Sequence, residues 1–160
     1  MPQIEESIEI AVPRADVFRF CHDMTNRPEW DEQVEHIELL TPRPIRQGTL
    51  LRIDASHAGG AVFTWDAEYV DFQFLSISRV RALDTAVSSP FKAGSLLTWE
   101  FSPAQSGTRF TWTWDYQPRG FIANIMDKVS GRAATARAIR RSLEELKKLL
   151  ESGRRAAPSA

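Results

Sequence analysis

The chain has 160 residues, 42% hydrophobic and 26% charged, a composition that is typical of one globular domain and excludes collagen-like, disordered and disulfide-rich classes. Its single cysteine excludes an intramolecular disulfide and multi-cysteine metal centres, and its net charge of -1 argues against nucleic acid as the main partner. No apolar run reaches the roughly 20 residues of a membrane span, and the first residues lack the pattern of a signal peptide. We therefore expect a cytoplasmic protein without stable membrane insertion.

The charge is distributed unevenly along the chain. Residues 1–40 hold ten acidic and three basic side chains, whereas residues 128–155 hold nine basic and three acidic ones. Two complementary solvated faces of one domain are the simpler interpretation, and an acidic partner or an anionic membrane surface is the alternative.

A strand, two short helices and six further strands are predicted in the first three quarters of the chain. Apolar alternation predicts a strand over residues 3–12, which Pro13 ends. Helical spacing predicts a short helix after Pro13 and a second one from Thr25 toward Trp30. The strand-like runs that follow are separated by turn residues and cover residues 34–40, 49–55, 61–70, 74–82, 95–102 and 108–117. Their short gaps favour antiparallel hairpins, because a parallel pair needs a long crossover.

A long helix is predicted from residue 121. One apolar stripe at helical spacing contains Ile122, Ile125, Met126, Val129, Ala133, Ala136, Ile139, Leu143, Leu146 and Leu150. Gly131 is a possible bend, and the small residues around it leave space between this helix and whatever it faces. We expect the helix to end near Gly153, so that one domain covers residues 1–152 and a disordered basic tail covers residues 153–160.

This order of elements resembles a known fold family. The segments AVPRADVFRFCHDMTNRPEW, RQGTLLRI and SGTRFTWTWDY are similar to the local marks of the START-like SRPBCC superfamily, and within it of the polyketide cyclase/dehydrase family. The resemblance implies an α+β helix-grip fold. In that fold an antiparallel sheet of about seven strands wraps around a long C-terminal helix, with two short helices after the first strand.

A closer resemblance is to the single-domain aromatase/cyclases of bacterial polyketide pathways. It rests on AVFTWDAEYV, SSPFKAGSLLTWEF and GTRFTWTWDY, and it assigns cavity positions to Phe63, Trp65, Phe91, Trp99 and Trp112. The same resemblance implies an arginine where this chain has Tyr69, and a tyrosine where it has Val34. Because two polar residues linked to cyclisation are changed, ligand binding is favoured over catalysis.

Aromatic side chains dominate the candidate site. Two-residue spacing places Phe63, Trp65 and Tyr69 on one strand face, and a second such face runs from Phe110 to Tyr116. A packed core explains most of these side chains, whereas a cavity lined for a ring-shaped or lipid-like ligand explains why they are so many. The predicted ligand-binding residues are Trp30, Val34, Phe63, Trp65, Tyr69, Phe91, Trp99, Trp112, Ile125 and Val129. Trp30 is expected at the entrance and Tyr69 as a neutral hydrogen-bond donor to the ligand.

No metal or cofactor site is predicted. His22, His36 and His57 lie in three different elements without zinc-ligand spacing, and Cys21 falls on the apolar face of a short helix, as a structural thiol does. The catalytic residues are therefore unknown. His36, Arg79 and Arg81 are further candidates for the cavity, but strand alternation does not fix the direction of their side chains.

Three functions follow from these observations. The first is a protein that binds a hydrophobic or aromatic small molecule between sheet and helix, such as a polyketide-like compound or a lipid. The alternative is a polyketide aromatase/cyclase or dehydratase that acts by acid/base chemistry in a templating cavity. A second alternative is a quinone or lipid carrier at a membrane surface, for which the sequence shows no exposed apolar anchor. The oligomeric state stays open.

Overall fold

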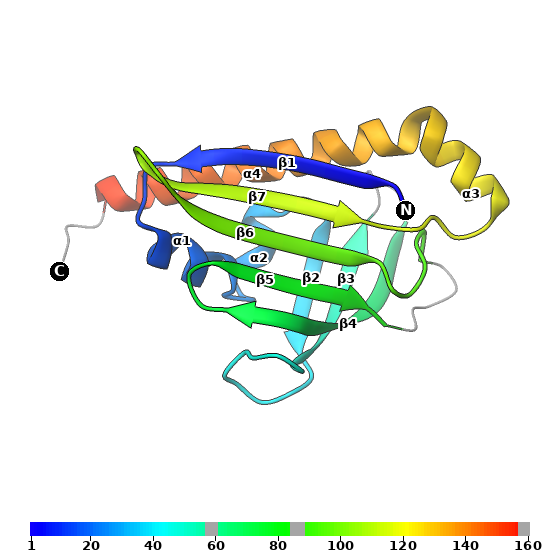
Figure 1. The fold of residues 1–160 in the computed structure, drawn as a ribbon, viewed down its shortest axis with the longest axis horizontal. Coiled ribbons are helices and arrows are strands. Elements are labelled where there is room, and N and C mark those ends of the chain that lie inside the picture. The colour runs from blue at the N-terminus through cyan, green and yellow to red at the C-terminus, as the bar shows by residue number, and fades with distance from the viewer. Residues whose placement is uncertain (57–60, 84–88, 157–160) are drawn as a thin grey trace.

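The protein is an α+β structure in which a curled antiparallel sheet holds a long helix (Figure 1). The computed structural model describes residues 1–56, 61–83 and 89–156. In this part of the chain the elements are β1 (Gln3–Ile10), α1 (Arg14–Cys21), α2 (Arg27–Trp30), β2 (Val34–Leu39), β3 (Leu50–Ser56), β4 (Val62–Gln73), β5 (Ile77–Ala82), β6 (Leu96–Ala104), β7 (Gly107–Asp115), α3 (Phe121–Met126), the π-helical turn η1 (Asp127–Gly131) and α4 (Arg132–Ala156). The predicted helix-grip fold is confirmed.

The described strands form a seven-stranded sheet in the order β1-β7-β6-β5-β4-β3-β2. All neighbouring strands are antiparallel. The first strand, β1, pairs with the last, β7, with Ile4 opposite Trp114 and Ile10 opposite Thr108. The β6–β7 turn approaches the end of β1 so closely that a Cβ on Gly107 would lie 2.5 Å from the carbonyl oxygen of Ile10. Only glycine fits there, which explains the glycine of the segment SGTRFTWTWDY.

The long helix runs along β1 and across the concave side of the sheet (Figure 1). Its second half packs into the core through Ile139, Leu143 and Leu146, each at most 1% exposed. α4 continues to Ala156, past the predicted end at Gly153, and the last part of the predicted tail, residues 157–160, lies outside the described residues. No helix in the described part of the chain is both long enough and apolar enough to span a membrane.

The first half of the predicted apolar stripe is placed wrongly. Ile122, Ile125 and Val129 are 77%, 45% and 76% exposed, and the side of the helix turned toward the sheet carries small and polar residues instead. The physical reason is that this half of the helix faces a cavity rather than a packed core, so apolar spacing does not identify its inner face.

The β4–β5 turn also differs from the prediction. The sequence predicts a break at residues 71–73, whereas β4 continues to Gln73 and the turn follows at Phe74–Ser76, with Leu75 at φ 80°. A register shift between Tyr69 and Asp71 accounts for the longer strand, because a bulge adds a residue without ending the pairing.

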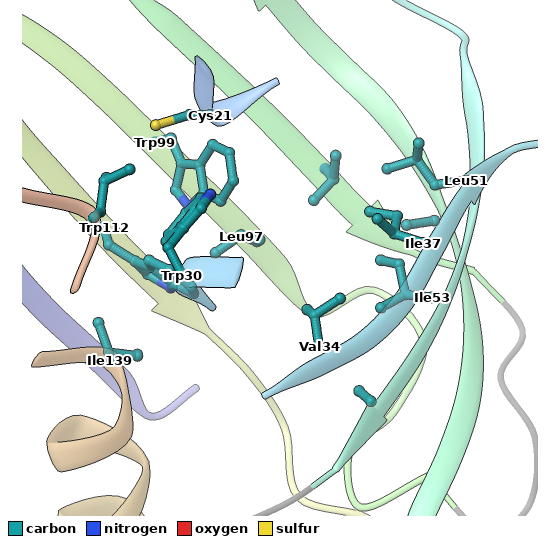
Figure 2. Close-up of a cluster of buried hydrophobic side chains, with 14 of the residues drawn as sticks. Cys21, Trp30, Val34, Ile37, Leu51, Ile53, Leu97, Trp99, Trp112 and Ile139 are labelled. Atoms are coloured by element: carbon teal, nitrogen blue, oxygen red, sulfur yellow. The ribbon is translucent and has the colours of Figure 1, made fainter. Parts of the chain in front are cut away.

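The inner core is rich in aromatic rings. Figure 2 shows the indoles of Trp30, Trp99 and Trp112 beside one another, and the ring centroid of Trp99 lies 5.6 Å from those of both other indoles. Aliphatic side chains of β2 and β3 complete the cluster on the other side of the picture. These buried tryptophans anchor α2 against β6 and β7.

Candidate functional site

A cavity of about 480 Å³ lies between the inner face of the sheet and the first half of the long helix. Its walls come from β2, β3, β4, β6 and β7, from α2, and from the helical segment Ala123 to Ile139. This volume falls within the range of small-molecule sites in proteins.

Aromatic rings form the sheet wall of the cavity. Phe91 contacts Trp65 and Trp114 edge to face, with centroids 5.1 Å and 5.0 Å apart, and Phe63 is 5.8 Å from Phe91. Strand alternation turns Phe63 and Trp65 inward from β4, while Trp112 and Trp114 face inward from β7. The result is a set of flat apolar surfaces, suited to a flat apolar ligand.

A buried ion pair closes the α2 end of the cavity. The guanidinium of Arg27 donates through Nε to Oδ2 of Asp31 at 2.7 Å, and the two residues are 6% and 1% exposed. Its Cζ lies 4.4 Å from the ring centroid of Trp99 and within 6 Å of two other indoles. Among the described residues Asp31 is the only hydrogen-bond partner of Arg27, so the Nη donors have no protein acceptor in the cavity wall.

A phenol and a carboxylate lie at the α3 end. The Tyr116 hydroxyl is 2.7 Å from both carboxylate oxygens of Asp127, and both side chains are buried. Burial, and then the hydrogen bond to Asp127, raise the pKa of Tyr116, so the phenol stays protonated and donates to the carboxylate. Asp127 begins the π-helical turn, a helical irregularity that is frequent at functional sites.

Small and polar residues form the helix wall. Ser130, Gly131, Ala134 and Thr135 line the cavity and leave the space that larger side chains would fill, and Arg137 lines it as a second basic residue. A Cβ on Gly131 would lie 3.1 Å from Oδ1 of Asp127, so glycine here also makes room for the carboxylate.

Half of the predicted ligand-binding residues lie in this cavity. They are Val34, Phe63, Trp65, Phe91 and Trp112. They come from three strands and the segment before β6, which the fold brings together around one space. That they contact a ligand stays a prediction.

The other five lie elsewhere. Trp30 and Trp99 pack in the aromatic core behind Arg27, and their Nε1 atoms have no acceptor among the described residues. Tyr69 shares the inner face of β4 but lies beyond the cavity, 5.4 Å from the ring of Phe72, and burial raises its pKa. Tyr69 is thus not among the residues that line this cavity, and its expected role as a polar anchor for the ligand stays a prediction. Ile125 and Val129 point to solvent, because the inner face of the helix lies on its other side.

The remaining polar candidates do not line the cavity. His36 is exposed beside Asp54, Arg81 pairs with Glu68, and Arg79 donates to Thr98. His57 lies outside the described residues.

His22 and Cys21 are buried parts of the core. Nδ1 of His22 donates to the carbonyl of Phe18 at 2.7 Å, and Nε2 accepts from the Ser78 hydroxyl at 2.7 Å. Burial lowers the pKa of His22 to about 4, and burial raises the pKa of the Cys21 thiol. Both groups are therefore neutral near pH 7.

Sequence reasoning missed Arg27, Tyr116 and Asp127 as site residues. Tyr116 is predicted only as part of an aromatic strand, and no pattern marks the other two as facing inward. The spacing of Arg27 and Asp31, four residues apart on a helix, predicts that they pair, but it does not predict that the pair is buried beside a cavity.

Comparisons with known proteins agree with this fold. The sequence model of the family described as polyketide cyclase / dehydrase and lipid transport matches residues 1–151. No curated protein matches the chain.

Several solved structures are similar. The Zhui aromatase/cyclase from a Streptomyces species superposes with a TM-score of 0.80 at 18% identity, over 99% of both chains. The ginseng major latex-like protein 151 from Panax ginseng has a TM-score of 0.71 at 11% identity, over 93% of this chain and 97% of that one. A protein from Thermus thermophilus has a TM-score of 0.76 at 20% identity, over 95% of this chain and 99% of that one. At these identities the likeness is one of fold.

Proposed function

Since the chain belongs to the polyketide cyclase / dehydrase and lipid transport family, we propose that it binds a flat hydrophobic or aromatic small molecule in this cavity. The ligand's apolar body lies against the indoles of Trp65, Trp112 and Trp114, and an oxygen of the ligand accepts hydrogen bonds from Arg27. Ligands with a carboxylate, phenolate or polarised carbonyl oxygen therefore bind better than apolar analogues.

The observation that carries the proposal is the buried guanidinium of Arg27. Its Nε is held by Asp31 at 2.7 Å, which fixes the guanidinium plane, and its Nη donors lack a protein acceptor among the described residues. The fully buried side-chain nitrogens without a partner among the described residues are Nε1 of Trp30 and Trp99, so the Nη atoms of Arg27 are open to the cavity space. A ligand oxygen in the cavity that accepts from them forms a charge-assisted hydrogen bond. The rest of the cavity wall is largely apolar and supplies the area that the ligand body covers.

A matched pair of fluorescent probes tests this assignment. 8-Anilinonaphthalene-1-sulfonate and N-phenyl-1-naphthylamine share a ring system, and only the first carries an anionic group. Titration followed by tryptophan fluorescence is expected to show one saturable site for each, with tighter binding of the sulfonate. The variant Arg27→Gln/Asp31→Asn removes both charges together, and the preference for the sulfonate should fall by about tenfold to a hundredfold, the value of a hydrogen bond to a charged group.

Controls separate the site from its surroundings. Arg81→Gln/Glu68→Gln removes an ion pair that is half-exposed on the sheet and should leave the preference unchanged. The variant Phe121→Ser/Ile122→Ser removes dye binding to the exposed α3 residues, and the titrations are repeated in it. An unchanged preference in Arg27→Gln/Asp31→Asn would contradict the role of Arg27, and no saturable binding of either probe would contradict the proposed function.

Acid/base catalysis is a second candidate, favoured by one observation. A carboxylate, Asp127, and a guanidinium, Arg27, belong to opposite ends of the same cavity. In that arrangement Asp127 takes a proton from the carbon between two carbonyls of a poly-β-ketone, while Arg27 donates to the enolate oxygen that forms. Regiospecific ring closure faster than in buffer, and lost in Asp127→Asn, would support a cyclase. Binding of the poly-β-ketone without such acceleration would leave the binding function alone.

A further inference from the structure

Large apolar side chains are exposed on the first turns of the long helix. Phe121, Ile122 and Val129 are 78%, 77% and 76% exposed, and Met126 and Ile125 follow with 57% and 45%. Their spacing places them on one side of the helix, and no residue of α3 is buried. In Figure 1 α3 projects beyond the ends of β1 and β7. We call these five residues the α3 patch; contiguous apolar surface of this kind marks an interaction site.

The charges around the α3 patch are positive. Between residues 121 and 132 the charged side chains are Asp127, Lys128 and Arg132, and Asp127 is buried against the Tyr116 hydroxyl. The exposed charges of this segment are therefore both basic.

Three basic residues of this part of the helix also form no ion pair with a described residue, unlike basic residues further along it. Within the described residues no carboxylate forms an ion pair with Lys128, Arg132 or Arg137. By contrast, three other basic residues of α4 each pair with a glutamate: Arg140 with Glu6, Arg141 with Glu32 and Lys147 with Glu151. Of the four basic side chains of residues 121–153 without an ion pair among the described residues, Lys128 and Arg132 lie beside the α3 patch. Arg137 lines the cavity, and Lys148 lies near the other end of α4.

We propose that the α3 patch docks on an anionic lipid surface. The apolar side chains enter the headgroup region, and Lys128 and Arg132 lie beside lipid phosphates or carboxylates. A second copy of the chain fits the charge less well, because a two-fold contact would bring the same basic residues together. An anionic bilayer satisfies both features of the surface.

The position of α3 gives docking a consequence for the cavity. Ala123 and Met126 line the cavity, and Met126 also belongs to the α3 patch. Met126 is therefore shared by the docking surface and the cavity wall, at the place where a hydrophobic ligand from a membrane would enter. Docking through the α3 patch is a property separate from ligand binding in the cavity, and it can be tested without a cavity ligand.

Vesicle flotation tests the docking surface. The full chain is mixed with phosphatidylcholine vesicles and, separately, with vesicles in which part of the lipid is the anionic phosphatidylglycerol. It is expected to float with the anionic vesicles and much less with the neutral ones. Phe121→Ser/Ile122→Ser should abolish flotation, and because neither side chain is buried the circular dichroism and melting temperature should not change. Lys128→Gln/Arg132→Gln should weaken partitioning by about tenfold or more, since each basic residue near such a surface contributes about fivefold.

The control is Leu40→Ser/Val62→Ser, which removes two exposed apolar side chains, one just after β2 and one in β4, and should float like the wild type. Failure of the wild-type chain to float with anionic vesicles would overturn the proposal. So would flotation that survives Phe121→Ser/Ile122→Ser, or a concentration-dependent dimer without vesicle binding that this variant abolishes. Vesicle flotation measures membrane docking, whereas the dye titrations measure ligand binding in the cavity. Either proposal can therefore fail while the other holds.

Discussion

At the scale of single residues, Arg27 has a structural role beside the binding role that we propose for it. The carboxylate of Asp31 and the faces of three indoles stabilise its charge in a largely apolar environment. Asp31 in turn accepts from the backbone N–H of Gln33 at 3.1 Å, which holds the carboxylate at the end of α2. The pair is net neutral, yet it leaves hydrogen-bond donors in the cavity wall.

Removing one member of this pair should destabilise the fold more than removing both. Arg27→Gln leaves Asp31, 1% exposed, without its cation and is expected to lower the free energy of unfolding by about 3 kcal/mol. Arg27→Gln/Asp31→Asn replaces the ion pair by amides and should cost less than the single change. Urea denaturation of the double-mutant cycle measures this, and additive costs would contradict the coupling.

His22 should make stability depend on pH. Its folded pKa of about 4 lies below its usual value of 6.5, because burial disfavours the charged ring. The unfolded chain therefore binds the extra proton between these two values, and stability is lost as the pH falls from 6.5 toward 4.

The expected loss from His22 is about 2 kcal/mol in the free energy of unfolding between about pH 7.5 and 5. Urea titrations at several pH values measure it in the wild type and in His22→Gln. The variant should be less stable at neutral pH and should show a smaller fall on acidification. The same fall in both proteins would show that another group is responsible.

At the scale of elements, the Tyr116–Asp127 contact ties the start of the long helix to the sheet. α3 has no buried residue, so this hydrogen bond and the cavity contacts of η1 are what hold the segment. The π-helical turn widens the helix at Asp127 and brings its carboxylate to the phenol of Tyr116.

Tyr116→Phe should loosen this segment without unfolding the molecule. A hydrogen bond to a carboxylate contributes about 1.5 to 3 kcal/mol, so amide hydrogen exchange of residues 121–131 should accelerate by about tenfold to a hundredfold. Exchange in the central strands should not change. Thr113→Val, a half-buried change in β7, the strand that ends just before Tyr116, is the control, and equal exchange in both variants would contradict the role of Tyr116.

At the scale of the whole molecule, one sheet serves two purposes. Around α1 and the second half of α4 its inner face packs into a core, where the Phe101 ring lies 5.0 Å from that of Phe18 and 4.7 Å from that of Phe110. Toward α3 the helix carries small residues, and the same sheet lines the cavity. The step from large apolar residues such as Leu143 to Ala134 and Gly131 separates these two regions along the helix.

The sequence predicts the fold well because the fold depends on local patterns. Alternation predicts the strands, and the short gaps between them predict antiparallel neighbours. The cavity depends on which face of an element points inward. Strand alternation is enough for Phe63 and Trp65. Helical spacing misplaces Ile125 and Val129, because the same apolar spacing marks the exposed α3 patch as well as a core. Arg27 escapes prediction because its burial depends on three tryptophans from three elements.

Filling the cavity tests the central claim most directly. Ala134→Phe places a ring in the space between helix and sheet, where about 480 Å³ is available, so the fold should keep its melting temperature within a few degrees. The chain with Ala134 and the Ala134→Phe variant are compared, and both carry Phe121→Ser/Ile122→Ser to remove dye binding at the surface. 8-Anilinonaphthalene-1-sulfonate is titrated into each by calorimetry. We predict one site per chain with alanine at position 134, and binding weaker by about tenfold or more with phenylalanine. Equal affinity in two folded proteins would contradict the assignment of this cavity as the ligand site.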